Sequence, residues 1–430
     1  MVIRHEKFTN LIWSNIDKGY FIPNSEKIND EVDKIISRKS GNNENKKILN
    51  ELKQMGLQDN VRVIDSENES LSAPLEYYFD YTDACNLQCT HCYNRDYLNS
   101  NTMTENQIEY IINDMYKNGI MRLHLAGGEP TLFPGKLRKY METAKKYGII
   151  TSMSSNGTMI TEEIGKILID NDVISFTISI ESADEEKNAK IRGKNNLDKA
   201  IEGIKKIVAY KEQNNGKFNI AIKMSYDIHT QAEDFEKMIK LAIELKVDVL
   251  KLINPERCIF HERGYYSSIA DSYYEVQNII RNLKKKYQEK LNITIVNSPV
   301  NYYCNSGLPN MKGCIGGQEL VAINPDGSVT PCLMNKYDLG NIFKDESIKK
   351  IYSNDKIQKY KKLIADYDCK NCNYHLQCRG GCQVRKIVEY GKITSIDPLC
   401  PIANNKNTQD IKEEKQKYKF FTKINVYHSL

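Results

Sequence analysis

The 430-residue chain has no long apolar run, no secretion signal and no basic patch. No hydrophobic stretch approaches the roughly 20 residues of a membrane-spanning helix. The first residues, Met1 to Glu6, lack the apolar core of a secretion signal. The 61 basic and 56 acidic residues leave a net charge of +5 and are spread along the chain, which argues against a nucleic-acid footprint. We therefore expect a cytoplasmic protein without a membrane or nucleic-acid partner.

Cysteine, in contrast, is plentiful. The chain has 12 cysteines, and a cytoplasmic protein does not keep its thiols as structural disulfides. Their spacing therefore points to metal ligation or catalysis.

The first 73 residues have the pattern of a small α+β unit. Weak alternation from Phe8 to Ile22 predicts a hairpin, and Asn29–Arg38 and Glu44–Met55 predict helices. The Ser/Asn/Glu-rich stretch Asp65–Ser72 is typical of a linker. We therefore expect a separate domain over residues 1–73.

Residues 74–298 alternate between strand-like and helix-like segments. Six strands separated by helices favour parallel pairing through right-handed crossovers. This predicts an α/β fold, a partial (β/α)6 TIM-like barrel, open or closed, with its chemistry at the C-terminal ends of the strands. The predicted strands are Leu75–Tyr81, Met121–Ala126, Ile149–Ser154, Val173–Ile180, Phe218–Ser225 and Asp248–Ile253.

The alternation stops after Ser298. Residues 299–410 are rich in loops and hold eight of the cysteines. Because the segment offers little apolar material for a core, we expect metal clusters to hold it together. The tail, residues 411–430, is charged and then aromatic, and its pattern predicts no particular structure.

Three cysteines follow the first predicted barrel strand closely. Cys85, Cys89 and Cys92 have the spacing C-x3-C-x2-C. Three thiolates on one short loop can hold three irons of a [4Fe–4S] cluster and leave the fourth iron open to a substrate group. The alternative is a zinc knuckle, but structural zinc almost always takes four protein ligands, and only His91 could serve as the fourth.

This loop resembles the signature of the radical S-adenosylmethionine (SAM) superfamily. The resemblance covers Leu75 to about Ile253, because Gly-Gly-Glu-Pro, Ser-Asn-Gly-Thr and Ser-Ile-Glu motifs end the second, third and fourth predicted strands, and Arg-Gly follows. It implies that Cys85, Cys89 and Cys92 hold the catalytic cluster. It also implies cofactor contacts from His91, Gly127, Gly128, Glu129, Ser155, Asn156, Ser179, Glu181 and Arg192.

The resemblance gives these residues separate roles. The glycine pair would lie against the methionyl amine of SAM, where glycine permits close backbone approach. Ser179 and Arg192 would hold the carboxylate. Glu181 would lie near the ribose, although the family usually has aspartate at that position. His91 would pack near the adenine. The chemistry implied is reductive cleavage of SAM to a 5′-deoxyadenosyl radical, which abstracts hydrogen from carbon.

Seven cysteines near the C-terminus have a distinctive order: Cys314, Cys332, then Cys369-x2-Cys372-x5-Cys378-x3-Cys382, then Cys400. This order and spacing resemble those of a SPASM domain, which binds two auxiliary [4Fe–4S] clusters. With the catalytic cluster, the resemblance implies three clusters in all. Cys304 is the natural eighth auxiliary ligand; without it the first auxiliary cluster keeps an open iron. A pair of zinc sites is the alternative. Cys258 falls outside these groups and is compatible with an inert buried thiol or a catalytic thiol. The implied ligand sets are Cys304, Cys314, Cys332 and Cys382 for one cluster, and Cys369, Cys372, Cys378 and Cys400 for the other.

SPASM proteins mostly act on peptides or proteins, so two enzyme classes compete. One class comprises maturases that install thioether or carbon–carbon crosslinks in ribosomally made peptides. The other comprises anaerobic sulfatase-maturating enzymes, which carry an aspartate base after the cysteine that matches Cys332; this chain has Leu333 there. A non-catalytic electron-transfer protein is a third alternative, which the intact three-cysteine loop disfavours. We therefore expect a peptide maturase.

The placement of residues 1–73 resembles that of a precursor-peptide recognition element. Such domains bind a leader peptide as an added strand at a sheet edge. An unrelated N-terminal cap is the alternative. The implied partners are a precursor peptide with a leader sequence and an electron donor such as flavodoxin or ferredoxin.

Overall fold

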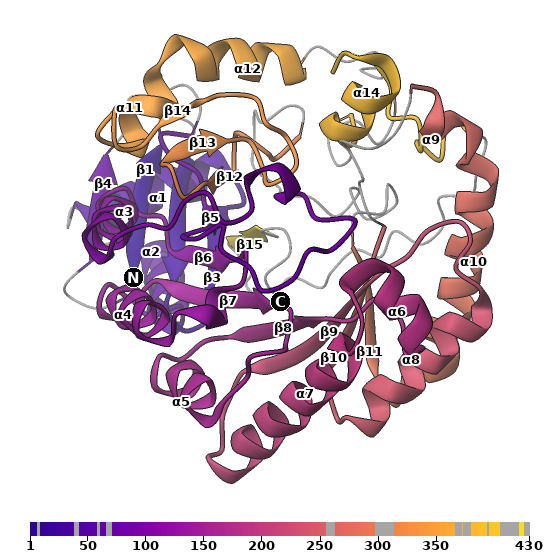
Figure 1. Ribbon diagram of the computed structural model, residues 1–430. Coiled ribbons are helices and arrows are strands. Elements are labelled where there is room, and N and C mark those ends of the chain that lie inside the picture. The colour runs from indigo at the N-terminus through magenta and orange to yellow at the C-terminus, as the bar shows by residue number, and fades with distance from the viewer. Residues whose placement is uncertain are drawn as a thin grey trace.

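Two sheets organise the protein in this computed structural model, one of five strands and one of ten. Figure 1 shows the larger sheet as a curved wall with helices along its outer side, and the smaller sheet beside it in indigo. The described residues are 1–6, 9–37, 43–57, 61–65, 71–254, 263–296, 314–365, 372, 380–393, 395–404 and 421–424.

Seven parallel strands form the barrel part of the larger sheet, which confirms the predicted α/β partial barrel. All six predicted strands are present, and a seventh that the sequence did not predict follows them. The last strand pairs only with its predecessor among the described strands, so the barrel is open. The strands are β5 (Glu76–Phe79), β6 (Arg122–Leu125), β7 (Ile150–Ser155), β8 (Ser175–Ser179), β9 (Asn219–Ser225), β10 (Val249–Ile253) and β11 (Asn292–Val296).

Amphipathic helices cover the outer side of these strands. The first begins with a capping box between Thr104 and Gln107 and buries Ile108, Ile111 and Met115 against the sheet. Within the part of the chain that the structure describes, no helix is both long and apolar enough to cross a bilayer. The helices are α3 (Glu105–Lys117), α4 (Pro134–Lys146), α5 (Glu162–Asp170), α6 (Glu185–Arg192), α7 (Asn196–Gln213), α8 (Ala232–Glu244) and α10 (Ala270–Tyr287). The short helix α9 (Tyr265–Ser268) lies instead beside α10 and the C-terminal segment.

The C-terminal segment continues the same sheet, because its first strand pairs in parallel with β5. Val321, Ile348 and Tyr360 are buried in the same core as the barrel. The expectation that this segment has too little apolar material for a core is therefore wrong for residues 314–365. Its elements are β12 (Leu320–Ile323), β13 (Ser328–Thr330), β14 (Gly340–Asn341), α11 (Ile348–Ser353), α12 (Asp355–Ala365) and α14 (Gln383–Tyr390).

The N-terminal sheet has the order β15-β3-β2-β1-β4. The predicted hairpin is formed by β2 and β3, and both predicted helices are present. Three strands were not predicted, and one of them, β15, comes from the C-terminal tail and pairs with β3. The elements are β1 (Val2–Glu6), β2 (Thr9–Ser14), β3 (Gly19–Pro23), β4 (Arg62–Asp65), β15 (Phe421–Ile424), α1 (Glu26–Ile36) and α2 (Asn43–Gln54).

The N-terminal unit packs firmly against the barrel. The Tyr20 hydroxyl lies 3.0 Å from the Gly119 carbonyl oxygen and accepts a hydrogen bond from the Met121 backbone N–H at 2.8 Å. Glu6 accepts hydrogen bonds from the backbone N–H and hydroxyl of Ser72, at the end of the predicted linker. Trp13 and Tyr20 belong to the barrel's own core. One face of the N-terminal sheet therefore packs on the barrel, whereas the other face has a core of its own that includes Ile12 and Val32.

Candidate active site

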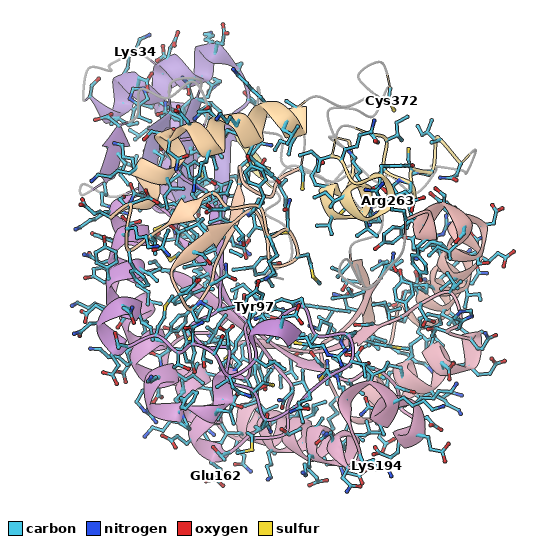
Figure 2. The ribbon with its side chains drawn as sticks, turned by 45° about the horizontal axis from the view of Figure 1, so that its top comes forward. Lys34, Tyr97, Glu162, Lys194, Arg263 and Cys372 are labelled. Carbon is cyan, nitrogen blue, oxygen red and sulfur yellow. The ribbon has the colours of Figure 1, made fainter. Side chains whose placement is uncertain are left out.

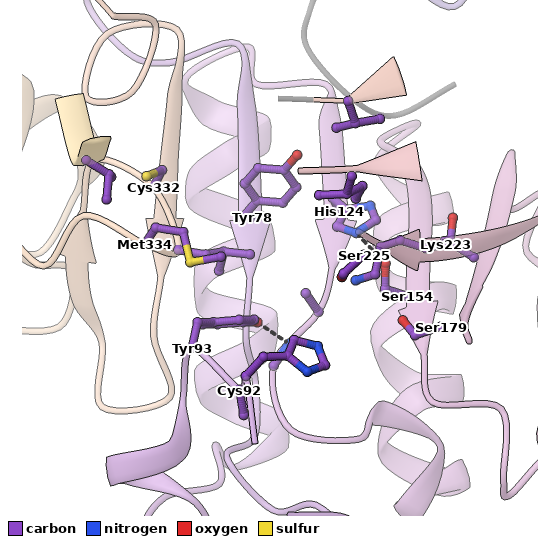
Figure 3. A pocket seen from close by; sticks show the side chains of 18 of the residues that line it. Tyr78, Cys92, Tyr93, His124, Ser154, Ser179, Lys223, Ser225, Cys332 and Met334 are labelled. Carbon is purple, nitrogen blue, oxygen red and sulfur yellow. Dashed lines mark hydrogen bonds between the residues drawn. The ribbon is translucent and has the colours of Figure 1, made fainter. Parts of the chain in front are cut away.

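A cavity of about 350 Å3 opens between the C-terminal ends of the barrel strands and the C-terminal segment. Figure 3 shows Cys332 and Met334 on one side of it, and His124, Ser154 and Lys223 on the other. The cysteine loop after β5 forms a further part of the wall. Residues that are far apart in the sequence therefore meet around one space.

Cys85, Cys89 and Cys92 all line this cavity. Burial raises the pKa of the Cys85 thiol to about 11, against an opposing hydrogen bond from the Leu87 backbone N–H and with smaller contributions from Glu129 and the other two cysteines. Burial also raises the pKa values of Cys89 and Cys92. Thiols in such a place need a positive partner before they ionise, which an iron centre provides.

Three cysteine thiols on one loop are a donor set that suits an iron–sulfur cluster. Among the described residues, no group of three or more His, Cys, Asp or Glu side chains is placed to hold one metal ion. A tetrahedral zinc site brings its thiolates within about 2.3 Å of one atom. Each thiolate of a [4Fe–4S] cluster binds a different iron, so its ligands stand farther apart.

Backbone hydrogen bonds fix the cysteine loop to the end of β6. The Gly128 N–H donates to the Thr82 carbonyl at 2.9 Å, and the Glu129 N–H donates to the Ala84 carbonyl at 2.7 Å. A Cβ atom at position 128 would stand 2.1 Å from the Ala84 oxygen. Glycine is therefore required there, and Gly127, at φ +108°, faces the same cavity.

Glu129 connects β6 with the end of β7. Its carboxylate is fully buried and accepts hydrogen bonds from the Asn156 backbone N–H at 2.6 Å and the Ser155 hydroxyl at 2.8 Å. Thr131 donates to it as well. Burial raises the pKa of Glu129, and these hydrogen bonds oppose the rise. Glu129 thus orients the two motifs, and the Asn156 side chain in turn donates to Asn86 inside the cysteine loop at 2.8 Å.

Glu181 and Arg192 form a buried ion pair beside the cavity. Arg192 Nε lies 2.9 Å from Glu181 Oε1, and the backbone N–H of Ser225 donates to Oε2 at 2.7 Å. His91 Nε2 lies 3.4 Å from Oε1. Burial opposes ionisation of Glu181, but Arg192 and His91 hold its pKa well below its usual range. Arg192 also contacts the cysteine loop, because its Nη1 lies 3.9 Å from the Cys89 sulfur.

Lys223 on β9 is a site residue that the sequence did not single out. It lines the cavity with Ser179 and Arg192. Burial lowers its pKa, as does the charge of Arg192, whereas Glu181, Cys89 and Cys92 raise it. Its signal in the sequence is a single cation at an inward position of an otherwise mostly apolar strand.

The described C-terminal cysteines fall into two places. Cys314, Cys332 and Cys382 line the cavity and surround Tyr360, whose pKa is raised well above its usual value by burial and then by these three thiols. Burial raises the pKa of Cys400, backbone hydrogen bonds oppose the rise, and Asp397 and then Cys372 add to it, so Cys372 lies near Cys400. Figure 2 shows Cys372 on the same side of the molecule as Arg263. The remaining cysteines of the sequence analysis, Cys258, Cys304, Cys369 and Cys378, lie outside the described residues.

A buried ion pair supports Cys382. The backbone N–H of Cys382 donates to Asp397 at 2.8 Å, and Arg385 Nε donates to the other carboxylate oxygen at 2.9 Å. Burial opposes ionisation of Asp397, but Arg385 keeps its pKa below its usual value. Asp397 thereby links the start of α14 with the loop that carries Cys400, whose backbone N–H donates to the Asp397 carbonyl at 2.9 Å.

Two family models match the chain at these elements. The radical SAM superfamily model matches residues 80–242, from the end of β5 to α8. An iron–sulfur cluster-binding domain model, SPASM, matches residues 314–373. Residues 80–242 are thus a radical SAM domain. A radical SAM enzyme with a SPASM domain uses S-adenosylmethionine and iron–sulfur clusters, which fits the cysteines around this cavity.

Curated relatives of this radical SAM enzyme are distant but cover most of it. Mycofactocin maturase MftC of Mycolicibacterium smegmatis is 23% identical over 353 residues, which are 79% of this chain and 86% of the relative. A cysteine-type anaerobic sulfatase-maturating enzyme of Clostridium perfringens is 27% identical over 340 residues, 70% of this chain and 86% of the relative.

Solved structures show the same fold over nearly the whole radical SAM chain. Streptococcus suis SuiB bound to precursor peptide SuiA superimposes with a TM-score of 0.68 at 17% identity, covering 92% of this chain and 97% of that one. Native anSMEcpe with bound AdoMet has a TM-score of 0.62 at 21% identity, covering 77% and 95%. Coverage of 92% leaves only about 34 of the 430 residues outside the superposition with SuiB, so it includes at least part of residues 1–73.

Proposed function

We propose that this enzyme is a maturase that makes a thioether or carbon–carbon crosslink in a ribosomally produced precursor peptide. The observation that carries the proposal is the shared cavity, in which Cys85, Cys89 and Cys92 face Cys314, Cys332 and Cys382. A substrate held there would lie between a radical-generating site and a second cysteine site. Likeness to SuiB, solved with a precursor peptide, and to a mycofactocin maturase supports a peptide substrate.

The residues of the cysteine loop would hold the catalytic cluster, and the ends of β6 to β9 would hold SAM. When bound, the cluster and SAM supply a 5′-deoxyadenosyl radical that abstracts a hydrogen atom from substrate carbon. The Gly127–Gly128 backbone would lie against the methionyl amine. Ser179 and Arg192 would hold the carboxylate, with Lys223 as a second cation beside them.

Three further groups would position the cofactor. Glu129 would orient Ser155 and Asn156, whose groups it already binds. Glu181 would fix Arg192 and orient His91 near the adenine. A contact between Glu181 and the ribose of SAM would have to form beside its ion pair with Arg192. The chain therefore contributes binding, orientation and exclusion of water, and the cofactor contributes the radical chemistry.

We assign two auxiliary [4Fe–4S] clusters to the C-terminal segment, for a total of three clusters. One set would be Cys304, Cys314, Cys332 and Cys382, and the grouping of its three described members around Tyr360 supports it. The other set would be Cys369, Cys372, Cys378 and Cys400, supported by the electrostatic contact of Cys372 with Cys400. Flavodoxin or ferredoxin would supply electrons.

The proposed domains are 1–73 for leader recognition, 74–298 for the barrel, 299–410 for the SPASM domain and 411–430 for the tail. A leader would bind the N-terminal sheet as an extra strand. The edge beside β3 is already paired with β15, so a leader would have to displace that strand or use the outer edge of β4. Binding at this sheet would raise the effective concentration of the core peptide at the cavity.

A sulfatase-maturating activity is the second candidate, because a relative of that class is 27% identical. That reaction needs a base beside the substrate. Here Leu333, directly after Cys332, lines the cavity and cannot accept a proton. This observation favours the crosslinking maturase.

The test uses anaerobically reconstituted, reduced protein with SAM. Short peptides encoded beside the gene are added, and 5′-deoxyadenosine and peptide mass are measured together. A crosslinked product would weigh about two hydrogens less than its peptide. Formation of 5′-deoxyadenosine with oxidation of only a sulfatase-derived cysteine or serine peptide to formylglycine would overturn the proposal.

A further inference from the structure

The inward side of the barrel is polar. His124 on β6 lies 2.8 Å from the Ser152 hydroxyl and 3.0 Å from the Ser154 hydroxyl. Lys251 on β10 stands next to Lys223 in the strand register and donates from Nζ to the Thr177 hydroxyl at 3.2 Å. Such groups inside a barrel indicate a polar ligand rather than a hydrocarbon one.

The charged side chains that line the cavity are positive among the described residues. Arg192, Lys223 and Lys251 line the cavity, whereas no aspartate or glutamate does so among the residues that the structure describes. His124 adds no charge, because burial and the nearby cations lower its pKa to about 3. The cavity therefore favours anionic groups.

Lys251 differs from the other two cations in its surroundings. Arg192 forms an ion pair with Glu181, and Glu181, Cys89 and Cys92 stabilise the charged form of Lys223. The charges that act on Lys251 come from Lys223 and from Glu76, which lies beside Arg122 at the other end of the lumen. No carboxylate oxygen of a described residue forms an ion pair with Lys251, although its side chain is almost fully buried. A buried ammonium without a counter-ion is costly, so a ligand anion beside it would be bound strongly.

We infer that Lys251 binds a carboxylate of the substrate segment that enters the barrel. This inference rests on the proposed function. It specifies which group of the peptide binds: a carboxylate, from either an acidic side chain or a free chain end. Thr177 would position the ammonium, and the Ser154 hydroxyl is a neighbouring polar group of the same wall. Lys251 is thus a specificity-determining residue, separate from the cations proposed for SAM.

The state of Lys251 can be observed directly. Burial and the neighbouring charge of Lys223 together lower its pKa to about 8, against an opposing effect of Glu76. A carboxylate at hydrogen-bond distance should raise this pKa by about one pH unit or more. Dimethylation of lysines with 13C-formaldehyde and NMR titration of the SAM-loaded holoenzyme would follow the resonance, which is assigned by its loss in Lys251→Met.

Three small probes distinguish the sources of the carboxylate. N-acetyl-aspartyl-methylamide offers an acidic side chain, N-acetyl-alanine offers a chain end, and N-acetyl-asparaginyl-methylamide is the neutral control. We expect one carboxylate probe, but not the amide, to raise the pKa of Lys251. Saturation-transfer NMR should show affinity for that probe falling roughly tenfold or more in Lys251→Met, with partial retention in Lys251→Arg.

Lys361→Met is the matched control. Lys361 also has a pKa lowered to about 8 by burial, but it does not line the cavity. Its variant should bind the probe as the wild type does, and it reports any loss that comes only from removing a buried lysine.

The inference is wrong if all three probes act alike, or if Lys361→Met loses affinity as Lys251→Met does. It is also wrong if SAM alone raises the pKa of Lys251 and no probe adds to it, since Lys251 would then belong to the cofactor site. These readouts need no turnover, so a failure of the peptide-crosslinking test leaves them interpretable.

Discussion

Gly128→Ala should disable the cysteine loop while leaving the barrel folded. The added Cβ would stand 2.1 Å from the Ala84 oxygen and 2.6 Å from its carbonyl carbon, whereas ordinary contact begins at 3.4 Å. The loop backbone would have to move by about 1.3 Å, judged from the oxygen contact. Both contacts are with backbone atoms, which cannot rotate away as a side chain would.

The cost follows from the groups that must move. Overpacking of a fitted position costs about 1–3 kcal/mol. The two hydrogen bonds from Gly128 and Glu129 to Thr82 and Ala84 are worth about 1 kcal/mol each. We therefore expect a loss of roughly 3–5 kcal/mol in urea unfolding of the metal-free chain. We also expect about four fewer irons per chain after anaerobic reconstitution.

Gly135→Ala provides the control. Gly135 lies in the first turn of α4, and a Cβ atom there would meet nothing within 4 Å. Because alanine is the better helix former by up to about 1 kcal/mol, this variant should be neutral or slightly more stable. Full iron content and unchanged unfolding in Gly128→Ala would refute the reasoning.

Three other predictions concern buried charge and the sheet edge. Burial raises the pKa of Glu76 from 4.5 to about 7, so between these values the folded chain keeps a proton that the unfolded chain has released. The free energy of unfolding therefore falls as the pH rises from about 5 to about 7. Glu76→Gln should therefore gain up to about 3 kcal/mol over wild type in urea unfolding at pH 8 and little at pH 4; a difference independent of pH would contradict this. Glu181→Gln should cost about 3–5 kcal/mol in the same assay, because it leaves Arg192 buried without a carboxylate, whereas Glu202→Gln in the exposed pair with Lys205 should cost less than about 1 kcal/mol; equal losses would show that burial of the pair is unimportant. Deletion of residues 405–430 removes β15 from the edge of β3 and should tighten leader binding, measured by fluorescence anisotropy, by up to about tenfold; unchanged affinity would mean that the leader uses another surface.

The periodic part of the fold could be predicted from the sequence, because each barrel strand is a short apolar run followed by an amphipathic helix. The more exposed strands could not. Only one of the five residues of β11 is buried, and the four residues of β4 alternate between partly buried and exposed. β15 pairs with a strand about 400 residues away, which no local pattern reports. The core of the C-terminal segment was missed because its apolar residues are divided among short elements.

The candidate site, too, could be predicted only in part. The cysteine spacing and the motifs at the strand ends indicated which residues meet, because parallel strands end at one edge of a sheet. Their partners could not be read from spacing: Glu181 binds Arg192 and Ser225 through contacts that depend on the curvature of the sheet. Lys223 and Lys251 were missed because a single lysine in an apolar strand marks an inward position only once the barrel is known.

The central claim is that the loop from Cys85 to Cys92 leaves one iron of its cluster free to bind SAM. Electron paramagnetic resonance of the dithionite-reduced, reconstituted protein tests it most directly. We predict a [4Fe–4S] signal that changes when SAM is added, and no such change in Cys85→Ala. Zinc in place of iron in anaerobically purified protein, or a wild-type signal that SAM leaves unaltered, would contradict the account.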